Sequence, residues 1–424
     1  MSGSIRRIGN FAIRLSLFIL TVAFSQICGR TGVLSSNFPA SMGTDALEGG
    51  YSEDRALVLG ESIAQAVEGS KTYSYKITLE SGQYLRVLII QSDIEVGMTL
   101  YAPDGQKLSE FIGRQKGPTP LSLIAEVSGT YRFEFCSLEK DPAQGHFKLR
   151  VEEIRPATVR DTHRIIAERA FAEAEELRYK WRAESSRQAI KKYEESLKHW
   201  RVAGEGSQEA TGLRNIGKIH LLLGEPRTAL IFYQQALALS RKLKDPKGEA
   251  ATLNGLAEVY LHFGENQKAM EHCSRALNLS RASGDRQGEA QALTNIAKVQ
   301  YEGSGELKRS LEYFDQSLAL WSYLSERRGQ AEALFYSGCI YSELGEAQKA
   351  ADYHNRALNL WRNLNDRRGE ALTLIAIGQL HFLLGDKQEA IDLWNSALEL
   401  VRPMGDKVWE ASILAKLGGI FMPH

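Results

Sequence analysis

A small residue recurs along much of this chain at a nearly constant interval. It occupies positions 189, 229, 269, 310, 350 and 390, as alanine at every position except Ser310, and the intervals are 40, 40, 41, 40 and 40 residues. Self-similarity at a fixed period near 40 predicts a solenoid, in which each unit buries its apolar face only against its neighbours. Solenoids bind other molecules along an extended surface and seldom carry chemistry themselves.

The residues around each recurring position share one motif. It combines apolar and small residues in a first segment with Gly, Ala, an aromatic residue and Ala-Leu in a second. In one unit the motif consists of Leu213, Ile216, Gly217, His220, Gly224, Ala229, Tyr233, Ala236 and Leu237. This pattern resembles the tetratricopeptide repeat, in its 40-residue variety, over five units from Ala189 onward. The resemblance implies pairs of antiparallel helices stacked into a right-handed spiral whose hollow side is lined by the first helix of each pair.

Small residues and turn residues recur in register with the motif. We expect Gly217, Ala257 and the recurring alanines to let the paired helices approach closely, with Tyr233, Phe314 and Trp394 filling the space between them. Between units, Gly284-Asp285, Asn365-Asp366 and Gly405-Asp406 predict a left-handed residue that ends one helix and an Asp that caps the next. The one extra residue near Gly303 predicts a longer turn or a local kink.

The N-terminal residues differ from the rest of the chain. Residues 1–25 place arginines before a short apolar run, Leu15 to Phe24, and end on Ala23-Phe24-Ser25, which is the order of a secretory signal peptide. An uncleaved membrane anchor is the alternative, and Cys28 raises lipidation as another, although Ile27 is bulky for the position before a lipidated cysteine. Residues 26–50 are rich in Gly, Ser and Thr and read as a flexible linker.

Residues 51–156 change to a period of two. Segments such as Tyr73-x-Tyr75-x-Ile77-x-Leu79 alternate and end in turns such as Ser81-Gly82, which predicts seven or eight short strands in an antiparallel β-sandwich. Composition shifts at Arg155-Pro156, and 160–180 reads as a long helix that leads into the repeats. We therefore expect a multidomain β + α chain, with the sandwich followed by an all-α tetratricopeptide-type superhelical solenoid over 157–424.

This order of domains also resembles the N-terminal half of exported bacterial proteins that end in a caspase-like peptidase of the CHAT type. Those proteins place a pre-peptidase-like sandwich before 40-residue repeats, and Ser81 to Val87 and Asp104-Gly105 match it here. The chain ends at His424, partway through a sixth unit, without an α/β peptidase segment. We therefore do not expect the peptidase activity of that family.

Composition and motifs argue against nucleic-acid binding and catalysis. Lys+Arg and Asp+Glu are equal at 52 each, so no net charge favours nucleic acid. The chain lacks phosphate-binding, nucleophile-elbow and zinc-protease motifs, and His220, His354 and His381 fall on packing positions of the repeat. Cys273 and Cys339 belong to different units, so neither a disulfide framework nor a Cys–His dyad is expected. We expect no cofactor, no metal and no enzymatic activity.

The concave face is the candidate binding site. Resemblance to members that hold extended peptides implies that Asn and basic residues of the first helices grip a ligand backbone and carboxylates, and the matching positions are Arg214, Lys218, Asn254, Asn295 and Lys298. The bland alternative is a solvated polar face. Further along, Phe335, Ile375 and Phe382 predict an apolar end, which a partner chain, a second copy or a downstream domain would cover.

Three functions remain open from the sequence. The favoured one is an exported, periplasmic or extracellular scaffold that binds a polypeptide on the concave face. The second is the regulatory half of a CHAT-type peptidase system, truncated or acting in trans. The third is carbohydrate or cell-envelope binding by the sandwich, although its aromatic residues alternate as a core would: Tyr73, Tyr75, Tyr84, Tyr131, Phe133 and Phe135.

Overall fold

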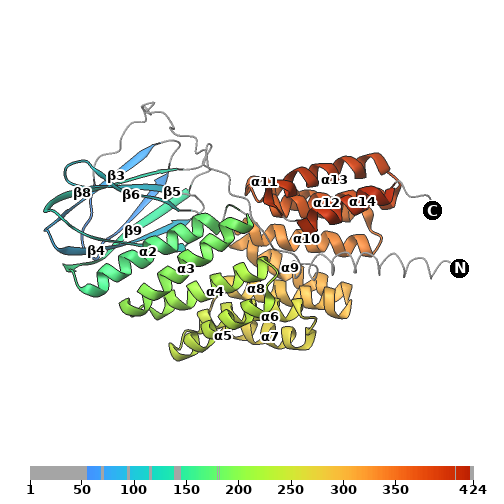
Figure 1. Ribbon diagram of the computed structural model, residues 1–424, viewed down its shortest axis with the longest axis horizontal. Helices are drawn as coiled ribbons and strands as arrows, with labels where there is room; N and C mark the ends of the chain where they lie inside the picture. The colour runs from blue at the N-terminus through green and yellow to red at the C-terminus, as the bar shows by residue number, and fades with distance from the viewer. Residues whose placement is uncertain are drawn as a thin grey trace. The chain divides into compact units, whose positions relative to one another are not determined.

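The computed structural model describes residues 55–67, 71–92, 96–113, 117–137, 145–178, 180, 182–405 and 407–420 (Figure 1). The predicted signal peptide and linker lie outside these residues. The chain divides into two compact units. The first contains the described residues up to Arg169 together with Val202–Gly204, and the second contains Ala170–Arg201 and the residues from Glu205 onward. No helix within the described ranges is long and apolar enough to cross a membrane.

The first unit is built on two β-sheets, as the alternating pattern predicted. One sheet has the strand order β1-β3-β8-β5-β6 and the other β2-β9-β4-β7. All strand pairs are antiparallel except β1 with β3. The strands of the first sheet are β1 (Arg55–Ala56), β3 (Thr72–Leu79), β8 (Gly129–Ser137), β5 (Val96–Tyr101) and β6 (Lys107–Gly113). Those of the second are β2 (Ser62–Val67), β9 (Gly145–Pro156), β4 (Gln83–Ser92) and β7 (Gly117–Ile124).

Aromatic side chains from both sheets form the core between them. Phe147 of β9 stacks on Phe135 of β8 with ring centroids 4.9 Å apart, and it meets Tyr75 of β3 edge-on at 6.1 Å. All three are almost fully buried. The other aromatic residues that we weighed as a sugar platform, Tyr73, Tyr84, Tyr131 and Phe133, are buried as well, so they serve the core.

A polar network joins the start of α2 (Val159–Arg178) to the sandwich, within the first unit. The buried Asp161 accepts two hydrogen bonds from Arg155, at 2.7 and 2.8 Å, and caps the helix through Thr158. One helical segment further, Ser122 donates to Glu168 at 3.0 Å. Burial raises the pKa of the Glu168 carboxyl to about 7, despite the opposing hydrogen bond from Ser122. The unit therefore extends past the predicted boundary at residue 156, because these contacts hold the first turns of α2 against β7 and β9.

The second unit consists of antiparallel helix pairs that follow one another along the chain (Figure 1). We call the first helix of each pair A and the second B. After α2 and α3 (Ala183–Ala203), the A helices are α4 (Gly206–Leu222), α6 (Pro246–His262), α8 (Arg286–Lys298), α10 (Arg327–Glu343), α12 (Arg367–Leu384) and α14 (Lys407–Ile420). The B helices are α5 (Pro226–Lys242), α7 (Asn266–Ala282), α9 (Leu307–Tyr323), α11 (Ala347–Asn363) and α13 (Lys387–Val401). A short 3₁₀ helix, Arg402–Met404, follows α13.

The predicted close approaches are present. A Cβ added at Gly217 would lie 3.1 Å from the Tyr233 ring, and one at Gly255 of the next A helix would overlap that ring from the other side. Tyr233 therefore fills a slot between two A helices that glycine leaves open. Cys273 and His354 occupy the same position in other B helices and are buried, as expected of packing residues.

The turns between units follow the predicted chemistry. Gly284 and Asn365 have φ of 65° and 50°, the left-handed conformation that ends a helix. Asp285 then caps α8 by accepting a hydrogen bond from the Gly288 N–H at 3.1 Å, and Asp366 caps α12 in the same way. Lys244 and Ser325 adopt the left-handed conformation as well, which their residue types do not signal.

The extra residue of the third unit is absorbed inside a helix. The segment Val299–Ser304, labelled η2, continues α8 as a π-helix and ends at Gly305 with φ of 67°. A π-helical turn takes one residue more than an α-helical turn, so an insertion can be accommodated without breaking the helix. Of the two expectations for this site, a longer turn or a local kink, neither describes the backbone as well as this wider turn.

Candidate binding face on the A helices

Polar residues one turn apart on four successive A helices form the candidate site. In the second unit, α4 contacts α6, α6 contacts α8, α8 contacts α10 and α10 contacts α12, so successive A helices adjoin. We define the A-helix face by its polar side chains, which are Arg214 and Lys218 on α4, Asn254 and Glu258 on α6, Asn295 and Lys298 on α8, Glu302 on η2, and Glu332 and Tyr336 on α10. Four of these pairs are spaced i, i+4, which places both members on the same side of a helix.

Lys298 is the most enclosed charge of this face. Its ammonium forms an ion pair with Glu332 and lies 5.1 Å from the centre of the Tyr336 ring. Although burial opposes the charged form, the Glu332 carboxylate raises the pKa of Lys298. Burial likewise opposes ionisation of Glu332, but Lys298 lowers the pKa of this carboxyl. Both groups are therefore charged, and they neutralise each other.

The remaining charges act on one another across several helices. Lys218 is exposed to solvent, yet protein surrounds it closely enough that desolvation, with repulsion from Arg178 and Arg328, lowers its pKa. Glu258 is partly exposed, and burial raises its pKa against the attraction of Lys298 and Lys218. Charges on α4, α6, α8 and α10 thus share one region.

The predicted ligand residues differ in what they offer. Arg214 donates to Thr211 at 2.7 Å, and its other terminal nitrogen, Nη1, is buried without a partner. Asn254 donates weakly to the Gly288 carbonyl at 3.4 Å, and its Oδ1 is buried without a partner. These two residues, with the exposed Lys218, leave polar groups unused.

Asn295 is different, because its amide is used inside the protein. The residue has 0% of its surface exposed. Its Nδ2 donates to the Asn254 carbonyl at 3.2 Å, and its Oδ1 accepts from Gln291 at 3.2 Å. Asn295 thus links α8 to α6, and a ligand contact from it stays a prediction.

Our residue list omitted the acidic half of this face. Glu258 follows Lys218 by 40 residues and precedes Lys298 by 40, so the period alone could have identified it. Glu302 and Glu332 have no such signal, because η2 and the 41-residue interval shift the phase of the pattern. Tyr336 was missed for the same reason.

The predicted apolar end is part of the chain's own core. Phe335 and Ile375 are each 8% exposed and belong to hydrophobic clusters of the repeats. Phe335 contacts Tyr336 at 5.3 Å between ring centres, and the partly buried Phe382 lies 5.9 Å from Trp394. Neighbouring helices therefore cover these side chains. Exposed apolar side chains near this end occur instead at Leu383, Leu384 and Leu414.

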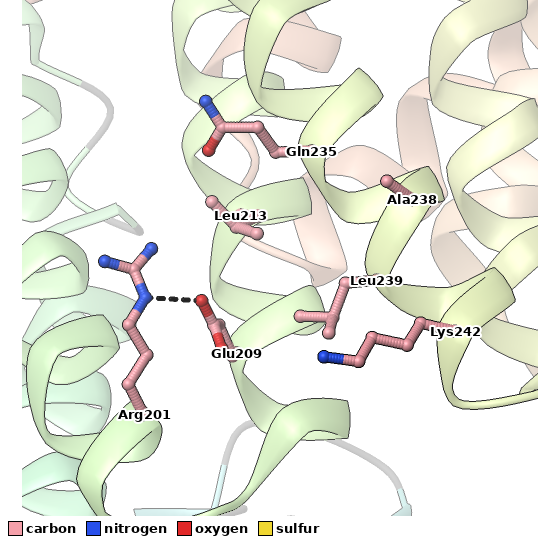
Figure 2. Close-up of a pocket in the computed structure, with 7 residues that line it drawn as sticks. All are labelled: Arg201, Glu209, Leu213, Gln235, Ala238, Leu239 and Lys242. Atoms are coloured by element: carbon pink, nitrogen blue, oxygen red, sulfur yellow. Dashed lines mark hydrogen bonds and ion pairs between the residues drawn. The ribbon is translucent and has the colours of Figure 1, made fainter.

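A separate pocket lies among α3, α4 and α5, outside the A-helix face. Figure 2 shows its lining residues, which are Arg201, Glu209, Leu213, Gln235, Ala238, Leu239 and Lys242. The Arg201–Glu209 ion pair in it, at 2.5 Å, recurs as Arg241–Glu249, Arg281–Glu289, Arg362–Glu370 and Arg402–Glu410 at 2.7–3.2 Å. Each pair joins the end of a B helix to the start of the next A helix. The pocket is therefore a joint between units, built like the others.

Thiols and histidines of the repeats lie in surroundings that suppress their reactivity. Burial raises the pKa of the Cys273 thiol to about 12 and lowers the pKa of His354 to about 4. Nucleophilic catalysis needs a thiolate with a base within reach. In the part of the chain that the structure describes, no group of three or more His, Cys, Asp or Glu residues could hold a metal ion.

Comparison with protein families decides the identity of the repeats. The tetratricopeptide repeat matches residues 179–242, 248–322, 300–363 and 329–403, which together cover more than half of the chain. The chain belongs to the tetratricopeptide repeat family. The whole-chain resemblance to CHAT-type proteins, in contrast, stays a prediction.

Solved structures with tetratricopeptide-like folds are similar to this chain. The Rap conjugation gene regulator of plasmid pLS20, in complex with the Phr* peptide, has 15% identity and a TM-score of 0.48, covering 61% of this chain and 74% of that one. Aspartyl phosphate phosphatase F from Bacillus subtilis has 14% identity and a TM-score of 0.43, covering 63% and 73%. At this similarity neither carries information on what this tetratricopeptide protein binds. A search of the curated proteins gave no match.

Proposed function

We propose that this chain is a non-enzymatic interaction scaffold that binds a polypeptide segment on the A-helix face. The tetratricopeptide repeat is generally a protein-interaction fold without catalytic activity. Solenoids of this kind present extended surfaces on which a chain can lie.

The unused polar groups of the A-helix face are the observation that carries this proposal. Arg214 Nη1 and Asn254 Oδ1 are buried and unpartnered, and Lys218 is an exposed cation on the same side of α4 as Arg214. A buried polar group without a partner costs free energy. A polypeptide backbone supplies both carbonyl acceptors and N–H donors, so a bound segment would satisfy both kinds of group.

A pull-down with matched variants tests the proposal. The full chain, carrying Arg214→Ala, Lys218→Ala and Asn254→Ala together, should recover a much smaller amount of the partner polypeptide than the parent chain does. Lys242→Ala, an exposed lysine at the end of the B helix α5, serves as the control and should leave recovery unchanged. Equal recovery of the partner by the triple variant would remove the A-helix face from the proposal.

The other expectations from the sequence rest on less. The regulatory role in a CHAT-type peptidase system stays a proposal, which the finding of a peptidase-like reading frame next to the gene would support. Export rests on residues 1–25, and N-terminal sequencing of protein recovered outside the cytoplasm tests it. The sandwich offers no aromatic platform in the six residues weighed for carbohydrate binding, since all are buried.

A further inference from the structure

We propose that the A-helix face holds a basic side chain of the bound polypeptide, a lysine or an arginine, between Glu258 and Glu302. This inference deepens the proposed function and rests on it. It names the chemistry of one ligand residue and the two carboxylates that recognise it.

The charge balance of the face is the first argument. Glu332 and Lys298 form an ion pair and neutralise each other. Glu258 on α6 and Glu302 on η2 make no hydrogen bond or ion pair with any described residue, and Lys298 acts on both at longer range. Lys218 is the only other cation of the face that acts on Glu258. Two carboxylates therefore remain beside a lysine whose charge is already satisfied.

An unpartnered buried acceptor is the second and independent argument. Asn254 is 3% exposed, and its Oδ1 has no hydrogen-bond partner. It lies one helical turn before Glu258 on the same side of α6, as i, i+4 residues do. A carboxamide oxygen and two carboxylates are all acceptors, so the group that satisfies them must be rich in donors. A lysine ammonium has three N–H donors and an arginine guanidinium has five.

The cation must be an organic one. Divalent metals need several oxygen ligands at close range, and no group of three or more acidic, His or Cys residues in the described ranges is placed to hold a metal. A side-chain cation needs no such convergence, because a long flexible chain can reach two separate carboxylates from one backbone position.

The π-helical turn brings the second carboxylate to an accessible position. The ten residues from Ala292 to Tyr301 are all buried, whereas Glu302 within η2 is exposed. Tyr301, one residue earlier, donates to Glu343 of α10 at 2.7 Å, which fixes η2 against the next A helix. Glu302 is thus the first accessible side chain after a fully buried run, and η2 determines where it lies.

A random library of displayed 12-residue peptides, selected on the full chain, tests the proposal. The peptides kept for analysis are those whose affinity falls with Lys218→Ala, because this dependence places them on the A-helix face. We expect enrichment of Lys or Arg at one position of these peptides. Calorimetric titration should then show that Glu258→Gln with Glu302→Gln raises Kd about tenfold or more, as loss of charge-assisted bonds does. Glu312→Gln, exposed on the B helix α9, should leave Kd unchanged.

A charge reversal guards against a folding defect in the glutamine variants. The variant with Glu258→Lys and Glu302→Lys should prefer the same peptide with Glu in place of its basic residue. Peptides that depend on Lys218 but carry no basic preference, and bind the double glutamine variant equally well, would overturn the cation site and leave the proposed function intact. A selection that yields no Lys218-dependent peptide would contradict the proposed function and this inference together.

Discussion

At the scale of single residues, the repeats depend on space that glycine leaves free. Tyr233 fits between Gly217 and Gly255, and Trp394 packs against Gly378 in a later unit. The motif predicted these contacts, since small and aromatic residues recur at matched positions. It could not predict that the third unit shifts in phase, and so it missed Glu302, Glu332 and Tyr336.

Replacing one of these glycines tests the slot. Gly255→Ala should lower the free energy of unfolding by about 1–3 kcal/mol, because the new methyl group overlaps the buried Tyr233 ring. Gly418→Ala in α14 is the control, since a Cβ there meets nothing within 4 Å, and the helix should gain about 0.5–1 kcal/mol. Urea unfolding measures both, and equal effects of the two substitutions would contradict the packing.

Glu168 gives the sandwich unit a pH dependence of known sign. Its pKa is raised to about 7 in the folded unit by burial, above the usual value near 4.3 for an unfolded chain. Its contribution to stability is therefore present below about pH 4.3 and lost as pH rises through about 7. Glu168→Gln removes the charge and keeps an acceptor for Ser122. Relative to the parent, this variant should gain about 1–3 kcal/mol between pH 4 and pH 8. Calorimetry of both proteins at the two pH values checks this, and a constant difference would refute it.

At the scale of helices, caps and turns followed the sequence more closely than the binding face did. Asp285 and Asp366 cap their helices as their type and position predicted. Local hydrogen bonds of this kind depend on a few neighbouring residues. The left-handed Lys244 and Ser325 were not predictable, because the repeat imposes this backbone on whatever residue occupies the position.

Two aspartates at helix starts allow a matched test of capping. Asp285→Ala should cost about 1 kcal/mol of stability, since it removes the bond to the Gly288 N–H. Asp386 occupies the N-cap of α13 but makes no side-chain capping bond, so Asp386→Ala should cost less than about 0.5 kcal/mol. Thermal melts followed by circular dichroism distinguish them, and a larger loss for Asp386→Ala would contradict the assignment.

At the scale of the whole molecule, tryptophan occurs on one side of the division between units. All six tryptophans lie at residue 181 or later, whereas the sandwich core is built from Tyr, Phe and aliphatic residues. Two units with separate cores were predictable from the change of period. The exact division near Arg169 was not, because it depends on the contacts of Asp161 and Glu168 with the sandwich.

This distribution allows the units to be followed separately. Phe147→Ala should destabilise the sandwich by about 3–5 kcal/mol, because Phe147 is fully buried against Tyr75 and Phe135. Tryptophan fluorescence during urea unfolding should keep the midpoint of the parent protein, while calorimetry shows the loss. A fluorescence midpoint that moves with the substitution would show that the two units unfold as one.

The wider turn at Val299–Ser304 has a consequence for engineering the array. A 40-residue copy of 246–285 in place of the 41 residues 286–326 would preserve the joints on either side, since those use the Arg–Glu pairs common to most units. The copy would carry His262 where the original carries Glu302. Modular replacement at this one position would therefore erase recognition while sparing assembly, which makes the insertion a signature by which relatives with the same ligand preference could be sought.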